Sequence, residues 1–199
     1  RGDGDADERG RRDAYPDDFD TRLNLADVYY QLARESLDAK NQPEYVDYLA
    51  KAPAEVPDPV RIDPTSPRPH TWLGIITAYQ GDLDSSETSF KNALRLNLAE
   101  RMELRAGTYY SNIAHISVYQ GKLGDARRYL DKGVKNGAPQ DEIDRISVLA
   151  AWKANDMVEA RDVFNSAIVL SPAFGATWDG APLPQPMTTF DDFAATCCS

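Results

Sequence analysis

Cysteine, histidine and long apolar runs are scarce in this 199-residue sequence. The two cysteines, Cys197 and Cys198, are adjacent, so they cannot form the framework of bridges that stabilises small disulfide-rich folds. A bond between such neighbours is strained. They fit either incidental thiols in a C-terminal tail or a bridge made elsewhere in an oxidising compartment. No stretch approaches the roughly 18 apolar residues that a membrane span requires, so we expect a soluble chain.

Metal-binding and catalytic motifs are also missing. The two histidines, His70 and His115, stand apart from each other and from cysteine, which predicts no zinc site. We expect His70 at an exposed helix start and His115 packed or lining a groove. The sequence has no GxSxG elbow and no Gly-rich phosphate loop. Alternating carboxylates from Asp3 to Asp7 lack the glycine and glutamate of a calcium loop. We therefore expect no metal, no cofactor and no enzymatic activity.

Basic residues are outnumbered by acidic ones, 22 against 32, which gives a formal charge of −10. This balance argues against sequence-independent binding to nucleic acid, because that binding needs Lys and Arg to neutralise phosphates. The charge is uneven along the chain. Residues 1–20 and residues 162–199 each carry −4, whereas the region between them is nearly neutral. The acidity therefore belongs to the two ends.

The first third of the chain divides into three segments by composition. Residues 1–19 are polar and lack apolar periodicity, which predicts a flexible acidic arm. Residues 20–52 carry apolar residues at helical spacing and predict a degenerate helical hairpin, with its second helix over 43–51. Residues 53–69 contain six prolines, which predict an extended connector without helix.

The next hundred residues contain a repeat. The tripeptide Tyr79-Gln80-Gly81 returns forty residues later as Tyr119-Gln120-Gly121, and a third copy is centred on Asn155. Gly and Asn tolerate the left-handed turn at a helix end, and intervals of 34 to 40 residues are typical of stacked helical hairpins. The longer interval predicts a lengthened helix. The sequence predicts six helices here and no strands, with the helices over residues 70–80, 84–96, 99–120, 123–134, 139–154 and 156–170.

These copies resemble tetratricopeptide repeats over residues 70–172. In the second helices, a small residue is followed by a large apolar residue and then by another small one. The matching residues are Gly81, Gly121 and Asn155 at the turn; Ser86, Ala126 and Ala160; Phe90, Leu130 and Phe164; Ala93, Gly133 and Ala167; Pro172 at the end; and Leu73-Gly74 and Ile113-Ala114 in the first helices. The resemblance implies an all-α fold: a TPR-like α-solenoid of stacked antiparallel helical hairpins with extended N- and C-terminal arms.

The resemblance also implies a groove, lined by the first helix of each repeat, that receives a peptide or a partner protein. The predicted groove residues are Trp72, Thr77, Tyr109, Asn112, Ser117 and Arg145. A clamp for a partner's C-terminal carboxylate is not expected. Only Asn112 is in register for it, and Thr108, Glu142 and Ile146 stand where that clamp needs other residues.

The C-terminal tail, residues 173–199, combines helix-interrupting Gly and Pro with large apolar side chains. Such a preordered extended segment loses little entropy on docking. The predicted docking residues are Phe174, Trp178, Leu183, Met187, Phe190 and Phe193. Two interpretations stay open: the tail folds back and caps the last hairpin, or it inserts into a neighbouring subunit. Either would cover the terminal face of a hairpin stack.

Three classes of function remain after this reasoning. The first is a non-catalytic scaffold that binds a peptide or protein in its groove. The alternative is a self-assembling structural protein, an exported filament or homo-oligomer that stacks solenoids or exchanges tails. The third is an enzyme or its accessory subunit, for which no catalytic residue can be named. The start at Arg1 instead of Met favours an exported chain, although a fragment would begin in the same way.

Overall fold

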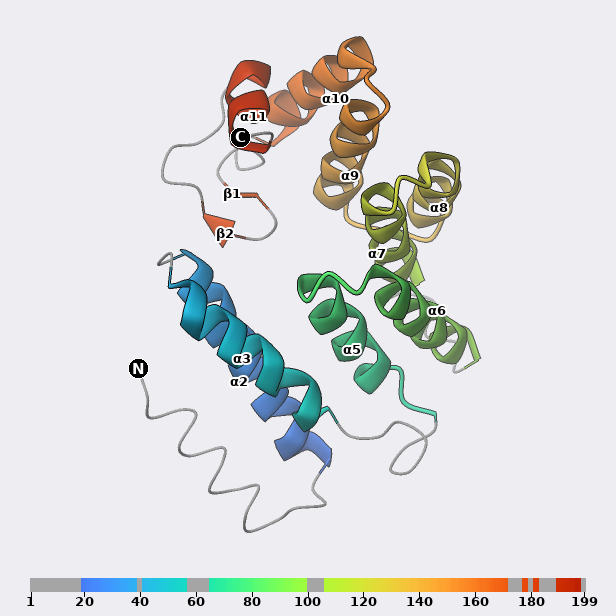
Figure 1. Ribbon diagram of the computed structural model, residues 1–199. Helices are drawn as coiled ribbons and strands as arrows, with labels where there is room; N and C mark the ends of the chain where they lie inside the picture. Colours follow the sequence, from blue (N-terminus) through green and yellow to red (C-terminus); the bar gives the residue numbers. More distant parts are fainter. Residues whose placement is uncertain are drawn as a thin grey trace. The chain divides into compact units, whose positions relative to one another are not determined.

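The chain is almost entirely helical over the residues that the structure describes, which confirms the predicted all-α class. The computed structural model describes residues 19–38, 41–56, 65–99, 106–171, 177–178, 181–182 and 189–197. The predicted arm over 1–19 lies outside them except for its last residue, Phe19, which begins α2. The chain divides into two compact units, residues 1–102 and residues 103–199 (Figure 1).

Unit 1 consists of two helical hairpins, α2 with α3 and α5 with α6 (Figure 1). Their bounds are Phe19–Asp38, Gln42–Glu55, Arg68–Tyr79 and Leu83–Ala99. Both helices of the first hairpin pack against α5. The buried core of this contact consists of Leu23, Leu25, Ala26, Tyr29, Ala33, Leu49, Ala52, Val56 and Ile76. The segment predicted as an N-terminal hairpin is therefore a helical hairpin, and it packs against the first helix of the next hairpin.

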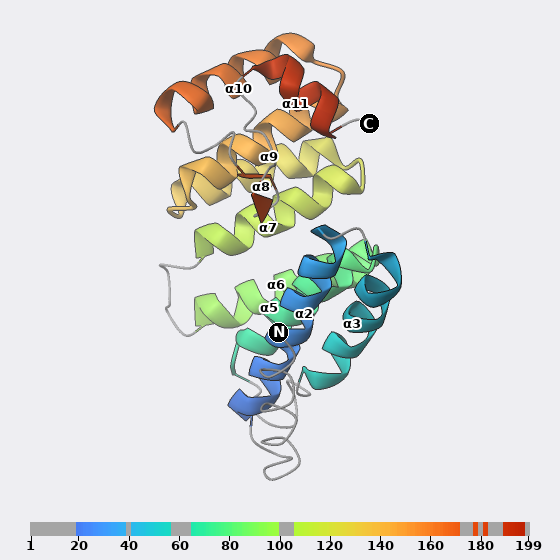
Figure 2. The same cartoon turned by 90° about the vertical axis from the view of Figure 1, so that its left-hand side faces the viewer.

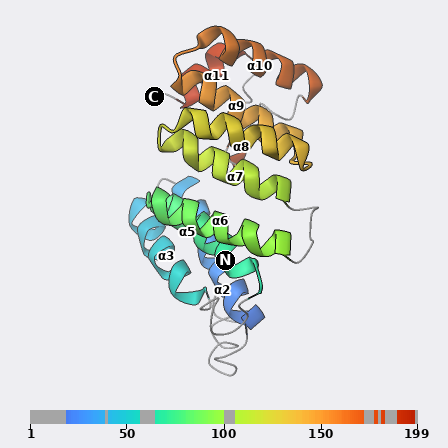
Figure 3. The same ribbon diagram turned by 90° about the vertical axis from the view of Figure 1, so that its right-hand side faces the viewer.

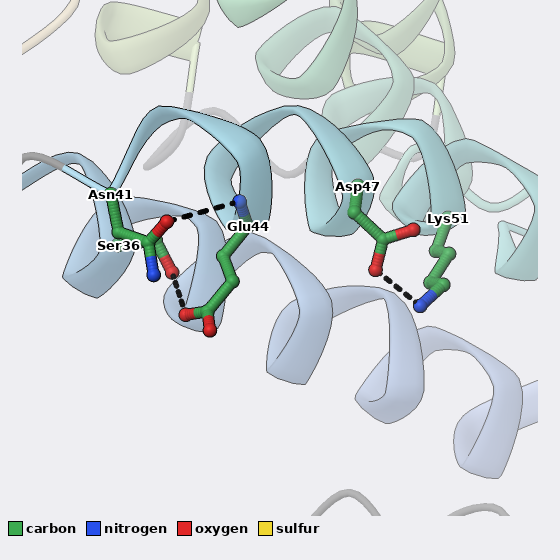
Figure 4. A network of polar contacts seen from close by, with 5 residues as sticks. All are labelled: Ser36, Asn41, Glu44, Asp47 and Lys51. Carbon is green, nitrogen blue, oxygen red and sulfur yellow. Dashed lines mark hydrogen bonds and ion pairs between the residues drawn. The ribbon is translucent and has the colours of Figure 1, made fainter.

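Polar side chains fix the turn between α2 and α3 (Figure 4). The Asn41 side chain accepts a hydrogen bond from the Glu44 backbone N–H at 3.5 Å, so it caps the first turn of α3. The Ser36 hydroxyl donates to the Glu44 carboxylate at 3.5 Å. An ion pair between Lys51 and Asp47, one helical turn apart, follows along the same helix.

Helix α3 continues through Pro53 to Glu55, so the predicted end of this helix and the exclusion of helix from 53–69 are wrong here. Proline has no N–H to donate to the carbonyl four residues earlier, which belongs to Leu49. The Gln80 side-chain amide donates to that Leu49 carbonyl instead, at 3.0 Å. A residue from the next hairpin thus satisfies the acceptor that the proline leaves.

The start of α5 is a second departure from the predicted connector. The helix begins at Arg68 and contains Pro69 in its first turn. Proline is well tolerated there because the first N–H groups of a helix have no partner within the helix. Residues 57–64, the middle of the predicted connector, lie outside the described residues.

Unit 2 consists of the hairpins α7–α8 and α9–α10, a short antiparallel strand pair and α11 (Figure 2). The helices span Ala106–Tyr119, Leu123–Lys135, Gln140–Lys153, Met157–Leu170 and Phe190–Cys197. The strands β1 and β2 span Thr177–Trp178 and Ala181–Pro182. Helix α9 packs against both α7 and α8, as Figure 3 shows, and α11 packs against α10.

The three predicted left-handed turns are confirmed. The φ angles are +81° at Gly81, +74° at Gly121 and +60° at Asn155. In each turn the following backbone N–H donates to the carbonyl five residues earlier, at 2.8–2.9 Å. This hydrogen bond closes the helix end and reverses the chain. The repeated tripeptide is therefore a turn signal.

A common register relates all four hairpins. In each hairpin we count from the residue that immediately precedes the second helix. These residues are Asn41, Asp82, Lys122 and Asp156. Eight residues later stands a buried large apolar side chain, and eleven residues later a buried small residue. These are Leu49, Phe90, Leu130 and Phe164, followed by Ala52, Ala93, Gly133 and Ala167. The first hairpin keeps this register although its sequence carries no turn glycine.

The predicted start of a long helix at residue 99 is wrong, because α6 extends to Ala99. The next first helix, α7, is described over Ala106–Tyr119, and residues 100–105 lie outside the described residues. The forty-residue interval instead reflects a second helix of 17 residues in α6, against 13 in α8.

The tail departs from the predicted extended segment. Its last part is the helix α11, and β1 and β2 form a short strand pair before it. The helix is possible because the interrupting Gly and Pro all precede Met187. Thr189 and Asp192 then form a reciprocal capping box: each accepts the backbone N–H of the other through its side chain, at 3.2 and 2.8 Å.

Candidate functional site

The candidate surface of unit 2 is formed by its first helices, α7 and α9. It consists of a stripe of accessible side chains along α7 and two half-buried residues of α9. Thr108 and Tyr119 are exposed, and Asn112 and His115 are half-buried between them. Their spacing of four, three and four residues places them on one side of α7. Helix α7 packs against α9, and Ser111 of α7 interacts with the Glu142 carboxyl group in the first turn of α9. We define the first-helix face as Thr108, Asn112, His115, Tyr119, Glu142 and Arg145.

Aromatic and ionic contacts organise this face. The His115 and Tyr119 rings lie 5.0 Å apart, and Tyr119 is 45% exposed. Arg145 pairs with Asp141 at 3.5 Å, while 17% of the Arg145 side chain is exposed. Partly desolvated Tyr and Arg side chains are the residue types that most often anchor protein interfaces.

Glu142 is the electrostatically unusual member of the face. Burial raises the pKa of its carboxyl group above the ordinary value, and the charge of Asp141 acts in the same direction. A hydrogen bond from Ser111 on α7 and the charge of Arg145 oppose this rise in pKa. The face therefore contains a carboxyl group, that of Glu142, whose charged form is disfavoured by burial although the positively charged Arg145 lies one turn away.

Only two of the six predicted groove residues lie on this face, Asn112 and Arg145. Ser117 is fully buried, and its hydroxyl donates to the Ile113 carbonyl at 2.8 Å. Tyr109 is only 6% exposed. Helical Ser and Thr satisfy their hydroxyl groups on the preceding turn, so they are compatible with burial. We therefore exclude Ser117 and Tyr109 from the candidate surface.

The two predicted groove residues of unit 1 are engaged within that unit. The Thr77 hydroxyl donates to the Leu73 carbonyl at 2.6 Å. Trp72 is half-buried, and the centre of its ring lies 5.9 Å from that of Tyr30 on α2. Tyr30 in turn meets Tyr79 edge-on at 5.2 Å. The aromatic residues of this first helix thus hold the two hairpins together.

Sequence reasoning missed His115, Tyr119 and Thr108 as a joint surface. Their spacing could have indicated this surface, because it places them on one side of a helix whose other sides carry Ala, Ile and Val. Serines within that apolar background obscured it, because they look exposed by residue type and are buried in the fold.

A second apolar site lies on the α9–α10 hairpin. We define the terminal socket as Val148, Ala151, Trp152, Ala160, Phe164 and Ala167. Phe190 and Phe193 of α11 fill it and are 4% and 0% exposed. The other predicted tail residues, Phe174, Leu183 and Met187, lie outside the described residues, and only the backbone of Trp178 lies within them.

The part of the chain that the structure describes contains no group of three or more His, Cys, Asp or Glu side chains that could hold a metal ion. His70 is half-buried near Arg95, and burial and then this positive charge lower the pKa of its imidazole. None of the described helices is long and apolar enough to cross a membrane.

Antiparallel hairpins, three of them closed by left-handed turns, pack in sequence within each unit and define a helical-repeat protein. Proteins of this class use the surface of stacked helices for binding. A tetratricopeptide repeat family model matches residues 111–173, so this region is similar to tetratricopeptide repeats. The comparison with curated proteins gave no match. The family match supports a protein–protein interaction scaffold, a class that is typically non-catalytic.

Proposed function

We propose that the chain is a non-catalytic scaffold that binds a peptide or a partner protein on the first-helix face of unit 2. Tyr119 and His115 supply aromatic surface, and Arg145 supplies a charge that can pair with an acidic group of the partner. The carboxyl group of Glu142 adds a hydrogen-bond acceptor. Its charged form becomes less favourable when a bound partner buries the site further.

Tyr119 carries this proposal. It belongs to the repeated tripeptide, yet its side chain is 45% exposed at the end of α7. In the earlier copy of the tripeptide, the Tyr79 ring packs against Tyr30 of the preceding hairpin. An exposed aromatic ring is a suitable anchor for a partner, and the partly buried Arg145 offers a second one.

Selection from a displayed library of short random peptides tests the proposal. We expect the full chain to enrich binders that lose about 10-fold in affinity when Tyr119→Ala or Arg145→Glu is introduced. Fluorescence anisotropy with a labelled selected peptide measures this loss.

Val134→Ala is the matched control, because Val134 is 55% exposed in the same unit but lies on a second helix. It should leave the affinity unchanged. Peptides that bind the Tyr119 and Arg145 variants as tightly as the original chain, or that lose affinity equally with Val134→Ala, would reject the first-helix face.

A second candidate function is self-assembly through exchange of C-terminal tails. It is supported by the docking of α11 onto α10 through two phenylalanines, because the same contacts can form between copies. Light scattering across a wide range of concentrations tests it. A constant monomer mass at all concentrations would reject exchange and filament formation alike.

A further inference from the structure

The two hairpins of unit 2 are covered in equivalent ways by the helix that follows each. On the α7–α8 hairpin, Ile143 and Ile146 of α9 pack into a cluster with Ala114, Ala126 and Leu130. On the α9–α10 hairpin, Phe190 and Phe193 of α11 pack into the terminal socket. Ala114, Ala126 and Leu130 correspond, 34 residues later, to the socket residues Val148, Ala160 and Phe164. Thus α11 occupies the place of a next first helix.

The shared pattern defines what such a site accepts. Both covering helices contain a pair of buried, large apolar side chains three residues apart, which places the pair on one helix side. Isoleucine is present in one case and phenylalanine in the other. The Phe193 ring lies 5.7 Å from that of Phe164 and 5.6 Å from that of Trp152. The pair of large side chains is therefore the recognised feature.

Charge adds a second feature at the terminal socket. The Arg161 guanidinium of α10 pairs with Asp191 at 3.3 Å and lies over the Phe190 ring at 4.9 Å. The Arg161 side chain is 54% exposed, so it stands at the rim of the socket and not within it. An acidic residue beside the first large side chain is thus favoured.

Helix α11 differs from α9 in how firmly it is attached. It has eight residues, against 14 in α9, and a helix of that length is marginal without tertiary contacts. In the described residues, no later helix packs behind α11, whereas α10 follows α9. Short elements with few anchors belong to the parts of a protein that open most easily.

We propose that the terminal socket is a binding site for an acidic amphipathic helix of a partner protein, carrying two large apolar side chains three residues apart. In the free chain α11 occupies this site as a displaceable internal ligand. Binding of the partner helix releases α11, so the tail lowers the apparent affinity of the socket by the fraction of time that it remains docked. This helix-in-groove site is separate from the first-helix face proposed above.

The test uses the full chain and a fluorescein-labelled peptide with the sequence of residues 186–197, in which Cys197→Ser prevents oxidation. Its binding to the original chain is compared with its binding to the Phe190→Ala/Phe193→Ala chain by fluorescence anisotropy. We expect at least about 10-fold tighter binding to the variant, because its own α11 no longer competes. Ala195→Ser, on an exposed part of α11, is the matched control and should retain the weak binding.

A charge exchange separates recognition from a general structural effect. Arg161→Glu in the Phe190→Ala/Phe193→Ala chain should weaken binding of the peptide, and Asp191→Arg in the peptide should restore it. The result does not depend on any partner of the first-helix face, so the two proposals can fail separately.

Three results would overturn this proposal. The first is a folded Phe190→Ala/Phe193→Ala chain, with unchanged circular dichroism, that binds the peptide no better than the original chain. The second is loss of helical signal in that variant, because α11 would then be an integral part of unit 2. The third is an original chain that is dimeric in light scattering and becomes monomeric in the variant, because a second copy would then be the occupant.

Discussion

The same three residues, Tyr-Gln-Gly, end the first helices α5 and α7 but serve different purposes in the two units. In unit 1 the Tyr79 carbonyl accepts a hydrogen bond from the Tyr45 hydroxyl at 3.1 Å, and Gln80 donates to α3. The turn is therefore a contact between hairpins. In unit 2 the equivalent Tyr119 is 45% exposed and forms part of the first-helix face. A repeat motif thus specifies the turn, while contacts outside the motif determine whether the turn is structural or available for binding.

The difference extends to the packing between the helices of each hairpin. In unit 1 Gly74 faces Phe90, and a Cβ atom added at Gly74 would lie 2.8–2.9 Å from three atoms of that ring. In the α7–α8 hairpin of unit 2 the corresponding residues are Ala114 and Leu130. The side chains in each pair are complementary in size. The smaller glycine faces the larger phenylalanine in α5–α6, and alanine faces leucine in α7–α8.

The largest expected effect comes from mismatching this pair. Gly74→Ala should lower the free energy of unfolding by about 2 kcal/mol, because the added methyl group collides with the Phe90 ring. Adding Phe90→Leu should recover part of the loss, since it reproduces the pair found in unit 2. Urea denaturation of the two single variants and the double variant measures the coupling energy. Strictly additive effects would show that the two residues do not share one packing constraint.

Removing the contact between hairpins in unit 1 should have the next largest effect. Gln80→Ala leaves the Leu49 carbonyl without the donor that replaces the missing proline N–H. We expect a loss of about 1.5 kcal/mol in the free energy of unfolding. Gln31→Ala is the control, because Gln31 is an exposed side chain bonded only to Asp27 in its own helix. Equal stability of the Gln80 and Gln31 variants would contradict the role assigned to Gln80.

The starts of the second helices offer a smaller test. Asp156 caps α10 by accepting the Glu159 N–H at 3.0 Å, whereas Lys122 makes no such side-chain bond at the start of α8. Asp156→Ala should cost about 1 kcal/mol, and Lys122→Asp should gain a similar amount. Thermal unfolding of both variants measures the difference. A destabilised Lys122→Asp chain would show that capping is not what distinguishes the two turns.

Turns, helices and the buried small and large residues of the hairpins were predictable from the sequence, because they depend on local chemistry: φ above zero at Gly121, helical spacing, and side-chain volume at Phe164 or Ala160. Which side of a helix is exposed was less predictable. The repeat resemblance predicts Ser117 in the groove, but this residue is buried and its hydroxyl is satisfied on the preceding turn.

Contacts between distant elements escaped prediction. The sequence around Pro53 indicates a helix end, and only the position of Gln80 explains why the helix continues. The helical end of the tail was also missed, although Thr189 and Asp192 carry the spacing of a capping box. For α3 the decisive partner lies in another hairpin, whereas the capping box of α11 is a local signal that the sequence itself carries.

The smallest expected effects are changes in stability with pH, and they have opposite signs in the two units. Glu142 in unit 2 has a raised carboxyl pKa because of burial, so the folded chain holds its proton more tightly than the unfolded chain does. The stabilisation is complete below the unfolded pKa and is lost as pH rises through the folded pKa. Glu142→Gln should therefore raise the melting temperature relative to the original chain at pH 7 more than at pH 4.

Asp82 in unit 1 has the opposite dependence. Hydrogen bonds from the Ser85 side chain and backbone N–H lower the pKa of its carboxyl group. Its contribution to stability is present above the unfolded pKa and is lost as pH falls through the folded pKa. Asp82→Asn should therefore lower the melting temperature relative to the original chain at pH 7 more than at pH 3. If the two variants shifted with pH in the same direction, the buried carboxyl of the first-helix face would not differ electrostatically from an exposed helix cap. The contrast between a binding surface and a structural turn would then have to rest on packing alone.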